Sequence, residues 1–145
     1  MDFSITEDQT MLQDSVSRFI QNDYDFDMRQ KNAATSQGFS TELWQSFAEL
    51  GWTAVPFAEA DGGLDGGATE LMLMMEQFGK GLVIEPYLPC IVMAGGVLKR
   101  LASDAQKQTW LGEIIEGSKL AALAFVEPQS RFDLHDVKLT ASKDG

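Results

Sequence analysis

The sequence contains only one cysteine, one histidine and four prolines in 145 residues. The single cysteine, Cys90, cannot form a disulfide within the chain, and no cysteine cluster has the spacing of a metal site. Cys90 lies among apolar residues and is expected to be a buried structural thiol. The single histidine, His135, lies in a polar stretch without a Ser, Cys or His partner nearby. We therefore expect a solvated loop residue there and not a catalytic group.

Basic residues and long apolar runs are also scarce. Eleven Lys and Arg against 22 Asp and Glu give a net charge of −11, which repels nucleic-acid phosphates and anionic membrane surfaces. The apolar runs stop well short of the ~18 residues that a transmembrane helix needs. The N-terminus also lacks the basic and apolar regions of a signal peptide. The sequence therefore predicts a cytoplasmic protein without a membrane span or a nucleic-acid partner.

Helical patterns account for most of the first 118 residues. With 44% hydrophobic and 23% charged side chains, the composition is that of a globular domain with a sizeable core. Capping residues, apolar residues at helical spacing and closing glycines predict five helices. They are expected over residues 7–22, from Ser40 or Thr41 to Gly51, over 70–80, from about Leu88 to Leu101, and from Ser103 to Gly117.

Three features of this helical part have a structural and a functional interpretation. The methionine-rich stripe over 71–78 is expected to be core packing, although methionines also suit an adaptable apolar ligand site. The glycine-rich stretch over 52–69 is expected to be a loop, because the Lys-Ser/Thr pair of a phosphate-binding loop does not follow it. Small residues at 94–96 allow a close approach by another helix or a ligand.

The buried stripe of the last helix is expected to comprise Trp110, Leu111, Ile114 and Ile115.

After Ser118 the pattern changes from helical to extended. Residues 120–126 form a continuous apolar run that Glu127-Pro128 interrupts, and apolar residues alternate with polar ones over 137–142. The sequence therefore predicts two strands joined by a polar turn or loop. Because two strands alone are only marginally stable, we expect a chain that ends inside a β-domain. The expected division is an α-helical domain over 1–118 and the start of a truncated β-domain over 119–145.

Several segments occur in a characteristic order: WQSFAELGWTAVPFAEADGGLDGG, then AQKQTWLGEIIEG, then AFVEP leading to Asp133. Together they resemble the acyl-CoA dehydrogenase family. The resemblance implies a mainly α chain, in which an N-terminal helical bundle of the acyl-CoA dehydrogenase type precedes the first strands of a β-barrel-like middle domain. The segment EPQSRFDL resembles the corresponding segment in one branch of the family, whose enzymes are built from paired subunits. The small subunit of pimeloyl-CoA dehydrogenase belongs to this branch.

The resemblance implies FAD as cofactor and places the strand and turn over 123–132 beside it. Carried over by position, the cofactor-binding candidates are Leu123, Phe125, Val126, Arg131 and Phe132. Val126 stands where the family has Thr, and it has no hydroxyl to donate to the flavin. Arg131 and Phe132 replace a Gly-Ser pair; Phe132 cannot donate a hydrogen bond, whereas Arg131 can pair with a phosphate.

The activity that the resemblance implies is α,β-dehydrogenation of an acyl-CoA thioester. In that reaction a carboxylate removes the α-proton while the β-hydrogen leaves as hydride to the flavin. The family's catalytic Glu belongs to a C-terminal helical domain, and no residue here matches it. We therefore assign no catalytic residue and expect the fragment itself to be inactive. The implied partners are the acyl-CoA substrate, a paralogous subunit in a homo- or hetero-oligomer, and an electron-transferring flavoprotein.

Two alternatives stay open at this point. One is a flavoprotein of the same fold with another chemistry, such as an acyl-CoA oxidase or a flavin-dependent monooxygenase, since a fold does not fix a function. The other is a non-catalytic helical interaction module, which the departures at Val126 and Phe132 allow. The flavin content of the intact protein separates this module from the two flavoprotein hypotheses.

Overall fold

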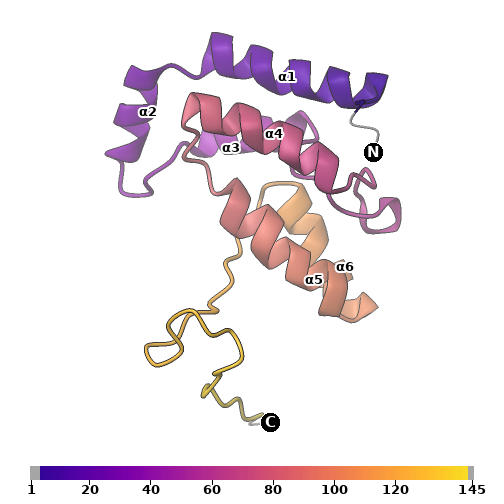
Figure 1. The fold of residues 1–145 in the computed structure, drawn as a ribbon, viewed down its shortest axis with the longest axis vertical. Helices are drawn as coiled ribbons and strands as arrows, with labels where there is room; N and C mark the ends of the chain where they lie inside the picture. Colours follow the sequence, from indigo (N-terminus) through magenta and orange to yellow (C-terminus); the bar gives the residue numbers. More distant parts are fainter. Residues whose placement is uncertain (1–3, 144–145) are drawn as a thin grey trace.

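The computed structural model describes residues 4–143, and helices dominate them up to residue 115. The helices pack into one body, and residues 119–143 extend away from it (Figure 1). Within this body α1 lies along α4, and α6 packs against both η2 and α5. In chain order the elements are α1 (Glu7–Asp23), α2 (Phe26–Ala33), α3 (Thr41–Glu49), the 3-10 turn η1 (Glu59–Asp61), α4 (Ala68–Gly81), the π-helical segment η2 (Leu88–Gly95), α5 (Gly96–Leu101) and α6 (Asp104–Ile115).

The five predicted helices are confirmed, and their ends have the predicted capping chemistry. In the capping box of α1, the Gln9 amide N–H donates to Thr6 Oγ1 at 3.2 Å and the Thr6 N–H donates to Gln9 Oε1 at 2.9 Å. Ser103 and Gln106 form the same box at α6. Gly51 and Gly117 follow α3 and α6 with φ of +77° and +74°, a backbone conformation that favours glycine.

The short helix α2 is absent from the sequence prediction. The Asp25 carboxylate caps it by accepting the Met28 N–H at 2.7 Å. No residue of α2 is buried, so it has no apolar period that a sequence pattern could detect. The Arg29 guanidinium Nε donates to the Leu82 carbonyl oxygen at 2.7 Å, which ties α2 to the end of α4.

The core is a cluster of aromatic rings at the centre of the helical body. Phe47 and Phe78 stack at 5.2 Å between ring centroids, and the Trp52 ring lies 5.0 Å from that of Phe47. Tyr87 meets Phe78 edge-on at 5.2 Å, and Phe19 packs against Trp52 at 5.3 Å. Such edge-to-face and offset pairs add stabilisation to that of burial alone.

The methionine-rich stripe of α4 belongs to this core, as predicted. Met74 and Phe78 are buried, while Leu71 and Met75 are partly buried and pack against the same cluster. The buried stripe predicted for α6 is only partly correct. Leu111 and Ile114 are buried and Ile115 is partly buried, but the Trp110 ring is 43% exposed, beneath the Lys119 ammonium group at 4.4 Å.

The helix predicted from Leu88 to Leu101 is continuous but changes its winding. Its first half, η2, is π-helical, a rare form that occurs frequently at functional sites. The small residue Gly95 lies where η2 meets the loop after α3. A Cβ atom there would lie 2.6 Å from Cζ of Phe57, so the missing side chain makes room for this ring.

The two predicted strands are not formed within residues 4–143, which contain no strand. Residues 120–126 are extended, but the segment at 137–141 does not pair with them through a backbone ladder. The Glu127 carboxylate instead accepts the N–H groups of Lys138 and Leu139, at 2.9 and 3.1 Å. A strand requires a neighbour that satisfies its backbone, and here a side chain takes up these donors.

Candidate functional site

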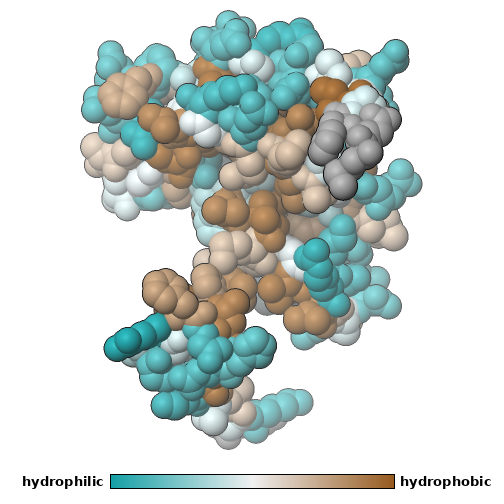
Figure 2. Space-filling view, viewed as in Figure 1, coloured by the Kyte–Doolittle hydropathy of each residue, from teal (hydrophilic) through white to brown (hydrophobic). Residues whose placement is uncertain are grey.

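An apolar groove lies where the C-terminal segment leaves the helical body. Its volume is about 370 Å³. Met93 of η2 contributes to one wall, and the C-terminal segment supplies the rest. Figure 2 shows apolar surface at this junction, between the helical body and the more hydrophilic end of the segment. The lining residues are Met93, Leu123, Ala124, Phe125, Glu127, Leu134, Val137 and Leu139.

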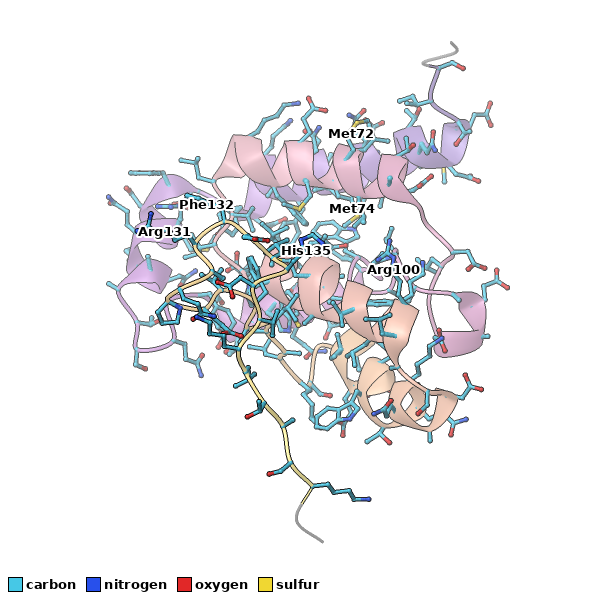
Figure 3. All side chains as sticks on the ribbon, turned by 60° about the horizontal axis from the view of Figure 1, so that its bottom comes forward. Met72, Met74, Arg100, Arg131, Phe132 and His135 are labelled. Atoms are coloured by element: carbon cyan, nitrogen blue, oxygen red, sulfur yellow. The ribbon has the colours of Figure 1, made fainter. Side chains whose placement is uncertain are left out.

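The structure brings together only some of the cofactor-binding candidates predicted from the sequence. Leu123 and Phe125 both line the groove, and both side chains are exposed, at 38% and 45%. Val126, Arg131 and Phe132 do not line it. Arg131 has a φ of +49°, and Phe132 is 99% exposed. Figure 3 shows these two residues and His135 on the loop of the C-terminal segment.

The backbone beside the groove has free hydrogen-bonding groups. Within residues 4–143, the N–H and C=O groups of residues 122–126 make no hydrogen bond. The neighbouring Ala121 N–H donates to the Cys90 Sγ atom, 3.4 Å away, which attaches the segment to η2. Exposed apolar side chains and free amides together fit a flat ligand with polar edges, or a further strand.

Two residues that a sequence pattern alone does not single out shape the groove. Met93 reaches it only because η2 passes beside the segment. Glu127, expected only to interrupt the apolar run, lies at the turn between the two walls. Hydrogen bonds hold the pKa of the Glu127 carboxyl below its usual value, first that from the Gln129 side-chain amide and then those from the Lys138 and Leu139 N–H groups. Glu127 is therefore a carboxylate at neutral pH.

The two rare residue types behave as predicted. Cys90 is fully buried, and burial raises the pKa of its thiol, as expected for a structural cysteine. His135 is almost fully exposed, with Nδ1 3.4 Å from an oxygen of the Asp133 carboxylate. Among residues 4–143 no group of three or more His, Cys, Asp or Glu side chains is arranged to hold a metal ion. None of the helices described is long and apolar enough to cross a membrane.

Comparison with known proteins identifies the helical body. A family model for the acyl-CoA dehydrogenase N-terminal domain matches residues 6–118. The chain belongs to the acyl-CoA dehydrogenase family. The acyl-CoA dehydrogenase FadE12 of Mycobacterium tuberculosis is 32% identical over 149 residues, which cover 99% of this chain and 37% of that protein. The chain thus spans little more than a third of the length of this relative.

Solved structures agree with this family assignment. PigA in its apo form superposes with a TM-score of 0.80 at 28% identity, covering 99% of this chain and 39% of PigA. The FAD complex of PigA gives 0.76 at 29% identity, covering 93% and 36%. The ChsE4–ChsE5 complex of Mycobacterium tuberculosis gives 0.77 at 26% identity, covering 84% and 34%. The predicted fold class, a helical bundle of the acyl-CoA dehydrogenase type, is confirmed.

Proposed function

We propose that this chain is the N-terminal part of an FAD-dependent acyl-CoA dehydrogenase that catalyses α,β-dehydrogenation of an acyl-CoA thioester. The observation that carries the proposal is the apolar groove with free backbone amides directly beside a helical body of this family. We assign residues 1–118 to the N-terminal helical domain and residues 119–145 to the start of the middle β-domain.

The residues at the groove fit a flavin. Leu123 and Phe125 offer a partly exposed apolar wall to one face of an aromatic ring system, and the unbonded amides of residues 122–126 can donate to its polar edge. PigA, a relative of similar fold, has been solved as an FAD complex. When bound, FAD would supply the hydride acceptor. Val126, Arg131 and Phe132 remain predicted cofactor contacts outside the groove wall.

The proposed reaction also needs a general base, and the groove does not supply one. A base for the α-proton must be a carboxylate in an apolar cleft, with a pKa high enough to accept a proton. Glu127 is the only carboxylate that lines the groove in the part of the chain described, and its oxygens already accept hydrogen bonds that lower its pKa. We therefore assign the base to a residue outside this chain, and no catalytic residue within it.

We also propose that the intact protein functions as an oligomer. The ChsE4–ChsE5 complex shows that relatives of similar fold assemble from different subunits, which supports a homo- or hetero-oligomer with a paralogous subunit. An electron-transferring flavoprotein is the proposed electron acceptor, and the cytoplasm is the proposed location.

The decisive experiment is the visible absorbance spectrum of the full-length protein, purified alone and together with any co-encoded paralogue. We expect flavin absorbance that bleaches anaerobically when one member of an acyl-CoA panel is added. Bleaching followed by hydrogen peroxide formation in air would favour an acyl-CoA oxidase instead. A colourless protein in both preparations, and no recovery of colour with added FAD, would contradict the proposal.

One observation favours a second candidate, a non-catalytic interaction subunit. Phe132 stands where the family has a hydrogen-bonding residue, and its side chain is 99% exposed. An exposed aromatic ring on a turn suits contact with another protein better than contact with a phosphate. This candidate predicts a colourless protein that still binds its paralogue, so the same purification separates it from the dehydrogenase.

A further inference from the structure

The turn between the two walls of the groove is closed by one side chain. The Glu127 carboxylate accepts three hydrogen bonds: from the Gln129 side-chain amide at 2.5 Å, from the Lys138 N–H at 2.9 Å and from the Leu139 N–H at 3.1 Å. Lys138 and Leu139 are eleven and twelve residues further along the chain. The carboxylate therefore bridges the start and the end of the loop.

The backbone of Glu127 is fixed as well. Its N–H donates to Ser130 Oγ at 3.1 Å, and the same hydroxyl donates to the Glu127 carbonyl oxygen at 3.0 Å. Ser130 is buried, whereas Glu127 is half-buried. The carboxylate thus projects from a rigid base toward the returning segment.

Little else in the described part of the chain holds the returning segment in place. Besides the bonds to Glu127, only the Gln129 side-chain amide reaches across, to the Asp136 carbonyl oxygen at 3.3 Å. The hydrogen bonds of Asp136 and Val137 to Asp133 and His135 are local to the loop. Since Val137 and Leu139 form one wall of the groove and Leu123 and Phe125 another, the groove depends on the Glu127 bonds.

We propose that Glu127 is a positioning residue for the flavin site: its carboxylate holds residues 137–139 beside residues 123–125 and so forms the apolar groove. The inference rests on the proposed function, because it takes the groove to be the flavin side of the site. Glu127 itself takes no part in the reaction. A carboxylate is required because two adjacent N–H donors face it, and an amide would set an NH₂ group against one of them.

The test compares E127Q with wild type in the full-length protein. Flavin fluorescence quenching gives the Kd for FAD, and we expect it to rise about tenfold in E127Q, because charge-assisted hydrogen bonds are the strong ones. Hydrogen exchange in the apo form should show faster exchange at the Lys138 and Leu139 amides. At saturating FAD, the circular dichroism of the visible flavin bands should change, a readout that a loss of stability alone would leave unaltered.

The matched control is E76Q, which removes a carboxylate from the exposed ion pair of Glu76 with Lys80 on α4. It should leave the Kd, the two amides and the flavin spectrum unchanged. A second variant, K138P, removes one donor and keeps the carboxylate, so it addresses the same bond if E127Q does not fold. We expect about a threefold weaker FAD affinity for K138P, since only one of the charge-assisted bonds is lost.

The outcomes separate this inference from the proposed function. Wild-type protein that binds no FAD overturns the dehydrogenase proposal and, with it, the flavin role of Glu127. Wild-type protein that binds FAD, together with E127Q or K138P that binds it equally well, overturns the positioning role alone.

Discussion

The helical body and the C-terminal segment treat their apolar side chains in opposite ways. Phe47 of α3 is fully buried among other aromatic rings, whereas Phe132 of the segment is 99% exposed. Helices satisfy their own backbone, so the body needs only to bring apolar faces together. An extended segment leaves its backbone groups unpaired until a neighbour arrives. The comparison teaches that helices can bury their apolar faces against one another, whereas an extended segment needs a neighbouring strand to satisfy its backbone.

The largest expected change in the free energy of unfolding comes from replacing a phenylalanine by alanine in each of the two regions. Phe47→Ala removes a ring that contacts four others in the core, so we expect a loss of about 3–5 kcal/mol in the free energy of unfolding. Phe132→Ala should change that free energy by less than about 0.5 kcal/mol, because its ring is in solvent. Urea unfolding monitored by circular dichroism measures both. Similar losses of unfolding free energy in the two variants would contradict the difference in burial between the two regions.

Two glycines of the helical body differ in the space available for a side chain. A Cβ atom at Gly63 would lie 2.6 Å from the Phe57 Cβ atom and closer still to the Phe57 carbonyl group. We expect Gly63→Ala to cost about 1–3 kcal/mol in the free energy of unfolding, since backbone must move to admit the methyl group. Gly112 on α6 has open space at the same position. Gly112→Ala should stabilise the helix by about 0.5–1 kcal/mol, and a loss there would argue against this packing.

The buried hydroxyl of Tyr87 makes the body sensitive to high pH. It donates to the Trp52 carbonyl oxygen at 2.8 Å, and burial raises its pKa above the usual value. Tyr87→Phe should cost about 0.5–1.5 kcal/mol at pH 7, because the Trp52 carbonyl loses one of two partners and keeps only the Val55 N–H at 3.4 Å. The stabilisation from Tyr87 is complete below the pKa of an unfolded tyrosine, about 10, and is lost as the pH rises from there toward the folded value.

The free energies of unfolding of wild type and Tyr87→Phe should therefore converge above pH ~10. Urea unfolding at a series of pH values from neutral to strongly basic gives this difference directly. A difference that stayed constant across the series would show that Tyr87 ionises equally in both states.

The smallest effect is expected at Lys119, where the two regions join. Its ammonium group lies 4.4 Å from the centre of the Trp110 ring and pairs with Glu113. Both interactions are at the surface, so Lys119→Ala should cost no more than about 1 kcal/mol. Lys119→Arg keeps a cation over the ring and should recover most of it. Urea midpoints at low and high salt measure the difference, and a large loss would mean that this junction stabilises the body.

The sequence predicts the helical body well because the signals there are local. Thr6 with Gln9 and Ser103 with Gln106 form their capping boxes within one helical turn. The helix α2 escapes prediction because its support is distant: Arg29 is bonded to the Leu82 carbonyl oxygen, 53 residues away. The π-helical winding of η2 likewise has no local pattern.

The candidate site is harder to predict, because it depends on pairing. The alternation of Val137, Leu139 and Ala141 predicts a strand. A strand forms only where the backbone of a neighbouring strand is hydrogen-bonded to it. Here Glu127 binds two of those amides, and no periodicity reports such a bond. Leu123 and Phe125, which the family resemblance makes candidates for cofactor contacts, line the groove. Whether they contact FAD stays a prediction that the absorbance and binding measurements test.

The reactivity of the single cysteine can be used to measure local opening of the helical body near the C-terminal segment. Cys90 of η2 is fully buried, and its sulfur accepts the Ala121 N–H, a bond that joins η2 to the C-terminal segment. Because Cys90 belongs to the core cluster, a thiol reagent can reach it only when the packing around it opens. With one sulfhydryl in each molecule, a single mass increment marks each molecule that has opened and reacted. Labelling rates therefore report how often the packing around Cys90 opens, without any engineered probe.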